Sequence, residues 1–279
     1  APLYTPKGVQ AYAELMARDG ARLVERWQTL ATSGREVEIA EEMTAVTASI
    51  ILKAMFNTES TASVHEMKDA VETMISFVNS QMALVRIPLW VPTAKNRKYL
   101  AARELVHRTI STLISQRRNI DESKWPDDLL SRLMKVRDES TGQPMSESLL
   151  RDESITTFFA GHETTARTMT FTWYALAKNP NVAERLQAEL DRVLGGRTPT
   201  AEDLRALPYA LQVIKEVLRL YPPAPFYVRD AIAADRIAGY DIPVGAALMM
   251  SPYFTHRHPQ FWKDPEDFDP ERWTREQEN

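Results

Sequence analysis

A short run of small and polar residues, Ala160 to Thr165, interrupts a long apolar stretch between about 148 and 176. Glycine, paired threonines and an ionisable residue each lower helix propensity. Small residues recur here at helical spacing and share one face: Thr157, Ala160, Gly161, Thr164 and Thr168. Two explanations stay open at this point. The face packs closely against another helix, or a bulky flat ligand lies against it while Glu163 and Thr164 handle protons.

His162 and Glu163 also begin the pattern of a helical zinc site, in which two histidines four residues apart bind the metal. The second histidine would occupy position 166, which is Ala166. The pattern is therefore incomplete and predicts no zinc. The chain contains no cysteine, which excludes disulfides, thiolate catalysis and cysteine-ligated metals within these residues.

A second charged pair, Glu216 and Arg219, lies near the end of an apolar helical pattern. Ion pairs at this spacing are common on surfaces and stabilise a helix by only about 0.2–0.5 kcal/mol. Apolar residues surround this pattern on most sides, however. If the pair is buried, it needs further partners, and Arg272 in the later Pro-Glu-Arg-Trp run is a candidate.

Arg229 follows a proline-stiffened segment, residues 222–228, which contains Phe226, Tyr227 and Val228. A single arginine held beyond an aromatic pair could offer its planar fork to a carboxylate. A solvent-exposed arginine without a specific partner is the alternative.

Helical periodicity covers most of the chain before residue 222, with a long central helix at about 148–178. Ser146 is predicted to cap this helix, and Asn181 the next. Glycine and proline become frequent after residue 222, with short β-like runs at 237–243, around a turn at Gly239-Tyr240-Asp241, and at 246–251. A two-stranded hairpin is marginal alone, so we expect these strands to pair with chain from elsewhere.

Size and charge limit the possible functions. The chain has 279 residues, of which 44% are hydrophobic, and 34 basic residues against 38 acidic ones. This balance gives no indication of nucleic-acid binding. Glu163 and Arg167 interrupt the longest apolar run, so no uncharged segment reaches membrane-spanning length.

Taken in order, these elements resemble the cytochrome P450 family. Ala160 to Thr165 resembles the [Ala/Gly]-Gly-x-[Asp/Glu]-Thr-[Thr/Ser] motif of the family's central helix. Glu216 and Arg219 resemble its Glu-x-x-Arg pair, and the run 270–273 resembles its Pro-x-Arg-Phe element, with Trp273 in place of phenylalanine. Each motif alone is weak, but three motifs in order are specific.

The resemblance implies a mainly α fold with a small β region, organised as a helical body (1–221) and a β-containing meander (222–279) of one incomplete domain. It implies haem b against the small-residue face and Glu163 and Thr164 as the catalytic pair that delivers protons. The cofactor-binding residues implied are Ala160, Gly161, Thr164, Arg229 and His256. The implied structural ion-pair network is Glu216, Arg219 and Arg272, and the implied substrate pocket is Phe159, Ala160, Phe226, Tyr227 and Val228.

The implied activity is insertion of one oxygen atom from dioxygen into an apolar small-molecule substrate, with electrons from a ferredoxin- or flavin-type donor and no role for nucleic acid. The family's iron ligand is a cysteine in a loop after the Pro-x-Arg-Phe element, and this chain supplies no such metal ligand. The chain therefore resembles an internal piece of a longer protein.

Two alternatives are a non-catalytic, haem-free fragment and a helical binding module. We expect a cytoplasmic protein of the soluble bacterial type, with a membrane anchor before residue 1 still open.

Overall fold

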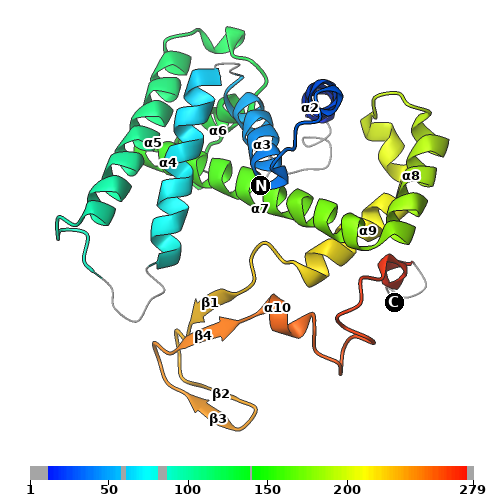
Figure 1. Cartoon of the computed structure of the whole chain (residues 1–279). Helices are drawn as coiled ribbons and strands as arrows, with labels where there is room; N and C mark the ends of the chain where they lie inside the picture. The colour runs from blue at the N-terminus through cyan, green and yellow to red at the C-terminus, as the bar shows by residue number, and fades with distance from the viewer. Residues whose placement is uncertain (1–11, 58–60, 81–86, 139, 275–279) are drawn as a thin grey trace. The chain divides into compact units, whose positions relative to one another are not determined.

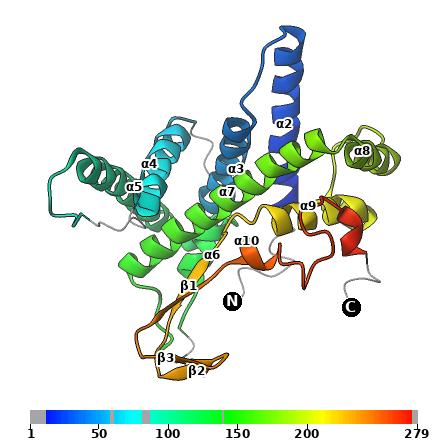
Figure 2. The same ribbon diagram turned by 60° about the horizontal axis from the view of Figure 1, so that its bottom comes forward.

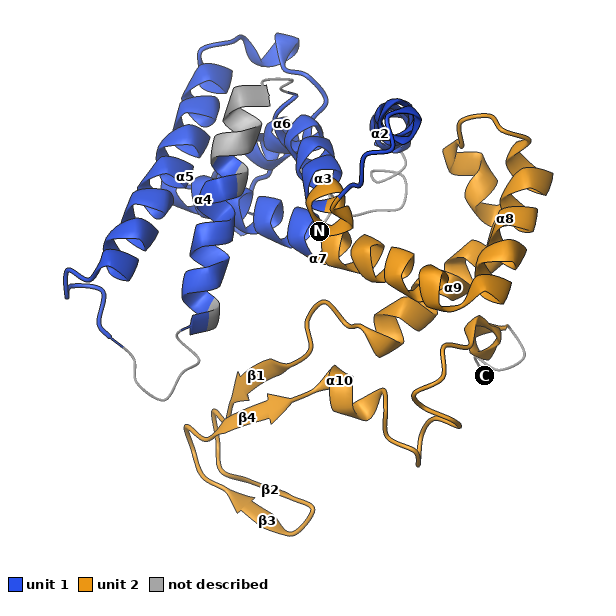
Figure 3. Cartoon of the chain, viewed as in Figure 1, with its two compact units in different colours: residues 1–37, 44–163 blue, residues 38–43, 164–279 orange. Residues whose placement is uncertain are grey.

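The computed structural model describes residues 12–57, 61–80, 87–138 and 140–274. They form two compact units (Figure 3): residues 1–37 with 44–163, and Glu38–Met43 with 164–279. The fold is mainly helical with two small antiparallel sheets, which confirms the predicted fold class. The division into a body up to residue 221 and a meander after it stays a prediction.

The first unit is helical (Figure 1). Two of its helices, α3 and α7, continue into the second unit. Its elements are α2 (Ala13–Thr32), α3 (Ile39–Phe56), α4 (Thr61–Ser80), α5 (Ala94–Arg118), η2 (Glu122–Lys124), α6 (Leu129–Lys135) and the first part of α7 (Glu147–Lys178). Ser146 caps α7 as predicted, since its hydroxyl accepts a hydrogen bond from the backbone N–H of Leu149 at 3.2 Å.

α4 and α5 run side by side in the first unit, as Figures 1 and 2 both show. The apolar core cluster of this unit takes side chains from α3, α4, α5, α6 and α7. Phe77 of α4 stacks on Tyr99 of α5 with ring centroids 4.1 Å apart. Fully burying one large apolar side chain contributes about 1.5–3 kcal/mol. The cluster includes Met55, Val71, Val106, Ile110, Leu130 and Phe158, each nearly inaccessible to solvent.

A buried ion pair fixes the start of α6 in the same unit. Arg117, near the end of α5, donates two hydrogen bonds of 2.6 Å to the two carboxylate oxygens of Asp128. Asp128 also caps α6 by accepting from the backbone N–H of Ser131 at 2.8 Å. Both charged side chains are less than a tenth exposed. One carboxylate thus neutralises an arginine and begins a helix.

The second unit contains the rest of α7, then α8 (Pro180–Leu194), η3 (Ala201–Ala206) and α9 (Pro208–Leu220). The predicted cap Asn181 is wrong. α8 begins at Pro180 after Asn179, because proline has no N–H to satisfy and its fixed φ suits the first helical position. Val182 of α8 packs with Tyr209 and Val213 of α9 in a small apolar cluster.

The strands of the described chain pair in two ribbons. β1 (Tyr227–Asp230) pairs antiparallel with β4 (Ala247–Met250), so the predicted run at 246–251 pairs with an earlier segment, as expected. The run at 237–243 supplies β3 (Tyr240–Ile242), which pairs only with the adjacent β2 (Asp235–Ile237) among the described residues. The expected partner from elsewhere is therefore wrong for this run. The turn between β2 and β3 is Ala238-Gly239, both at positive φ, so the prediction that placed Tyr240 and Asp241 in the turn is wrong.

After the sheets, α10 (Pro252–Thr255) and η4 (Pro270–Trp273) are short. In the part of the chain that the structure describes, no helix combines the length and the apolar character needed to cross a membrane.

The buried Arg117–Asp128 pair is expected to stabilise the folded state. Replacing Arg117 by alanine leaves the Asp128 carboxylate buried without its counter-charge, so the free energy of unfolding should fall by about 3–5 kcal/mol. Urea unfolding measures the change. The control is Arg118→Ala, which removes a neighbouring arginine whose ion pair with Glu147 is about half exposed and should cost less than about 1 kcal/mol. Equal losses in the two variants would show that burial does not set the strength of the Arg117 pair.

Candidate functional site

The motif at 160–165 lies inside α7, and its side chains differ in exposure. Ala160 and Thr164 are both exposed. Residues four apart lie on one face of a helix, so these two side chains form a small, accessible surface one turn long. Glu163 is half-buried beside it.

Gly161 has a packing role that the sequence left open. A Cβ atom built at this position would come within 2.8 Å of the Cδ1 atom of Ile51 in α3. A larger residue here would have to displace the Ile51 side chain, so this glycine permits the close contact of α7 with Ile51. The helix-packing explanation therefore holds for Gly161. Its predicted contact with a cofactor stays a prediction.

His162 is fully buried on another side of α7. Its ring stacks on Phe158 at a centroid distance of 5.2 Å, and its Nε2 atom lies 4.0 Å from Oε2 of Glu163. The described residues contain no group of three or more metal-binding side chains. His162 is thus held in the core by ring stacking.

The threonines after the motif satisfy their hydroxyl groups within the helix. Thr168, Thr170 and Thr172 each donate to the carbonyl oxygen four residues earlier at 2.8 Å. This local bonding explains how several threonines are tolerated in one long helix.

The predicted substrate residues lie in both compact units. Phe159 is partly buried and packs against the core of the first unit. Phe226 is half-buried, and Tyr227 and Val228 on β1 are more than two-fifths exposed. Their role in binding a substrate stays a prediction.

Glu216 and Arg219 on α9 form the best-defined polar centre of the described chain, and each is at most 1% exposed. Arginine has five N–H donors in a fixed plane. Two bind the Glu216 carboxylate at 2.7 and 2.9 Å. Three bind the carbonyl oxygens of His256, Pro265 and Asp267 at 2.7–3.0 Å. Every donor of Arg219 is used, and one side chain holds three backbone carbonyls of residues 256–267.

The Glu216 carboxylate also has hydrogen-bond donors at both of its oxygens. It accepts hydrogen bonds from the backbone N–H of Asp269 and from the indole N–H of Trp273, both at 3.0 Å. Nε of Arg272 lies 3.3 Å from the same carboxylate. The structure therefore brings Glu216, Arg219 and Arg272 together in the second unit. It also explains what Trp273 adds, because phenylalanine has no N–H to donate.

His256 joins this centre through its backbone and its ring. Its carbonyl accepts from Arg219, and its Nδ1 atom lies 3.3 Å from the Arg219 carbonyl oxygen. This arrangement fixes His256 against α9. Its predicted role in binding a cofactor stays a prediction.

Arg229 lies on β1 and is exposed. Its guanidinium lies 5.2 Å from the centre of the Tyr227 ring and donates to the carbonyl of Val228 at 3.0 Å. A cation over an aromatic face is held in place while most of its donors remain available to an anionic group.

Sequence reasoning missed Glu189 of α8. Its carboxylate is buried and accepts from the backbone N–H groups of Tyr209 and Ala210 at 3.0 and 2.9 Å, so it caps α9 from another helix. The signal was present: α9 starts after Leu207, which has no capping oxygen. The cap holds the helix that carries Glu216.

Known proteins share both the sequence pattern and the fold of this chain. The cytochrome P450 family model matches residues 2–279. The chain is 32% identical over 278 residues to cyclooctatin synthase and 33% identical over 272 residues to cyclooctat-9-en-7-ol 5-monooxygenase, both of Streptomyces melanosporofaciens. These matches cover 98% and 97% of this chain, but 59% and 58% of those proteins.

Among solved structures, the heme domain of cytochrome P450DA is similar with a TM-score of 0.88 and 27% identity. The match covers 99% of this chain and 60% of that one. The chain thus spans about three-fifths of the length of the relatives that it matches.

The indole N–H of Trp273 is expected to stabilise the fold through its hydrogen bond to Glu216. Trp273→Phe removes one donor from a buried carboxylate, and hydrogen bonds to charged groups contribute about 1.5–3 kcal/mol, so the free energy of unfolding should fall by that amount. Urea unfolding is the measurement. The control is Trp125→Phe, which removes an indole donor to the neutral carbonyl of Ile120 near the surface and should cost about 1 kcal/mol or less. An unchanged stability in Trp273→Phe would contradict the role given to the indole.

Proposed function

Because the chain belongs to the cytochrome P450 family, we propose that the protein containing it is a haem-dependent monooxygenase. It inserts one oxygen atom from dioxygen into an apolar small molecule. The observation that carries this proposal is the exposed pair Ala160 and Thr164 beside Glu163, within a family motif on a long helix. The name of cyclooctat-9-en-7-ol 5-monooxygenase supports the apolar substrate.

The family implies a haem cofactor, and we propose haem b. The small side chains of Ala160 and Thr164 fit it, because they leave the helix accessible to a flat ring over one turn. Arg229 fits a carboxylate of the cofactor, since its guanidinium is exposed and planar. Gly161 and His256 complete the proposed cofactor-binding residues. The chain contains no cysteine, so a thiolate ligand for the iron would come from residues outside these 279.

When bound, haem supplies the redox chemistry that activates dioxygen. The proposed work of this chain is to supply protons. The Thr164 hydroxyl can donate and accept at once and so hold a water molecule beside the face. The Glu163 carboxylate, one residue away on α7, can pass protons to that water. Both groups are therefore assigned to proton delivery.

The charged centre on α9 has a different proposed role. Glu216, Arg219 and Arg272 hold the meander and touch no substrate. Phe159, Ala160, Phe226, Tyr227 and Val228 are proposed to line the substrate site. We also propose a ferredoxin- or flavin-type electron donor and a cytoplasmic location.

The absence of cysteine favours one alternative, in which these 279 residues by themselves are a non-catalytic helical fragment or binding module. The full-length protein tests the proposal against the binding module. After reduction and treatment with carbon monoxide it should show the thiolate-haem band, and with an electron donor and dioxygen it should form oxygenated product. A spectrum with an ordinary haem band, or with none, would favour the binding module.

Thr164 gives the most specific test of the mechanism. In full-length protein, Thr164→Ala should lower the ratio of product formed to dioxygen consumed at least several-fold. The reason is that positioned proton transfer contributes about 10²–10⁴-fold to a step that depends on it. Thr164→Ser keeps the hydroxyl and should retain most of the coupling. An oxygen electrode and product quantification give both terms of the ratio. Equal coupling in wild type and Thr164→Ala would remove this residue from proton delivery.

A further inference from the structure

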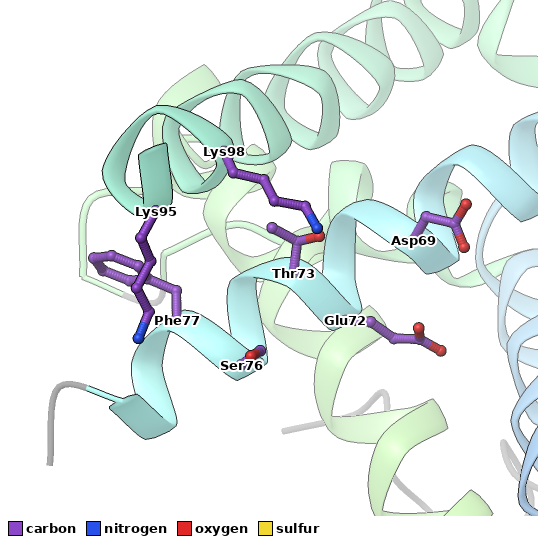
Figure 4. Close-up of a pocket in the computed structure, with 7 residues that line it drawn as sticks. All are labelled: Asp69, Glu72, Thr73, Ser76, Phe77, Lys95 and Lys98. Carbon is purple, nitrogen blue, oxygen red and sulfur yellow. The ribbon is translucent and has the colours of Figure 1, made fainter. Parts of the chain in front are cut away.

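A groove of about 540 Å³ lies between α4 and α5 in the first unit, apart from the α7 motif (Figure 4). Its volume falls within the range of small-molecule binding sites. It is lined by Asp69, Glu72, Thr73, Ser76 and Phe77 on α4 and by Lys95 and Lys98 on α5. No role for this groove follows from the proposed monooxygenase function.

Two lysines make one end of the groove positive. Lys95 and Lys98 are three residues apart, so they share a face of α5, and both reach toward α4 in Figure 4. Neither forms an ion pair with any residue that the structure describes. The first turn of α5 contains no acidic residue, although acidic residues are favoured there. Two like charges at this spacing repel each other, and an anion between them would remove that repulsion.

Two hydroxyl groups face the lysines from α4. Thr73 and Ser76 are also three residues apart, and in Figure 4 the Lys98 side chain extends toward Thr73. Within the described part of the chain, neither hydroxyl makes a side-chain hydrogen bond. Two ammonium groups and two hydroxyls together offer the number and kind of donors that a phosphate group accepts.

Phe77 and the far end of the groove define the rest of the ligand. Phe77 lies beside Lys95 in Figure 4, is 6% exposed and is held by its stack on Tyr99. Asp69 and Glu72 are exposed toward the other end of the lining. Their carboxylates attract an ammonium group or accept from a hydroxyl. The groove therefore runs from a positive end to a negative end.

We propose that the α4–α5 groove binds a phosphate ester that also carries an ammonium group. The phosphate lies between Lys95 and Lys98 with the hydroxyls of Thr73 and Ser76, and the ammonium group lies toward Asp69. A free amino-alcohol phosphate and a lipid headgroup share this chemistry.

Calorimetric titration of the full-length protein tests the proposal with O-phosphoethanolamine and with inorganic phosphate. Both should bind saturably, and Lys98→Gln should weaken both about tenfold, since it removes a charge-assisted hydrogen bond. Asp69→Asn should weaken O-phosphoethanolamine and leave inorganic phosphate unchanged. Lys124→Gln removes the same charge from an exposed site of the same unit outside the groove and should change neither affinity.

A parallel titration with phosphatidylethanolamine vesicles identifies the source of the ligand. Saturable vesicle binding that Lys98→Gln weakens indicates a lipid headgroup, and binding of the soluble ester alone indicates a free metabolite. Two results would overturn the proposal: no saturable binding of any of these probes, or equal weakening by Lys98→Gln and Lys124→Gln, which would show only general attraction to a charged surface.

Discussion

A buried arginine must have all of its donors satisfied, and the end of the second unit is arranged to do that for Arg219. Its five N–H groups reach one carboxylate and three backbone carbonyls. An unpaired N–H group here would cost desolvation free energy that no hydrogen bond offsets. Residues 256–269, between α10 and η4, form no helix or strand, so the hydrogen bonds from Arg219 help to fix their path. Glu189 serves the same end by capping the helix from which Arg219 projects.

The central helix α7 meets a different constraint, since it needs side chains of different kinds on different sides. Gly161 lets α3 approach, as Ile51 leaves no room for a Cβ atom. His162 fills the core by stacking on Phe158. Ala160 and Thr164 stay small and exposed on a third side. The motif thus combines a packing requirement at Gly161 with the surface that we propose for the cofactor.

Local patterns predicted much of this fold, because helical periodicity and capping depend on neighbours in sequence. The central helix and its Ser146 cap are examples. Contacts between distant segments were harder to predict from the sequence. The buried Glu216 carboxylate accepts a hydrogen bond from Trp273, 57 residues later, and the sequence pointed to Arg272 in that run as a candidate partner but not to the Trp273 indole. Nothing local in Glu189 indicated that it caps α9. The polarity of the α4–α5 groove was also hidden, since it arises only when two helices lie side by side.

The central claim is that the exposed face of α7 receives haem, and the haem content of Ala160→Leu tests it most directly. In full-length protein, the leucine would occupy the space of the ring. The matched control is Ala177→Leu, the same change at an exposed position near the end of α7. Haem per chain is read from the absorbance of reduced, carbon-monoxide-treated protein, with circular dichroism to show that helices persist. We predict a folded Ala160→Leu protein that has lost most of its haem and an Ala177→Leu protein with the thiolate-haem band of wild type. Full haem content in Ala160→Leu would contradict the account.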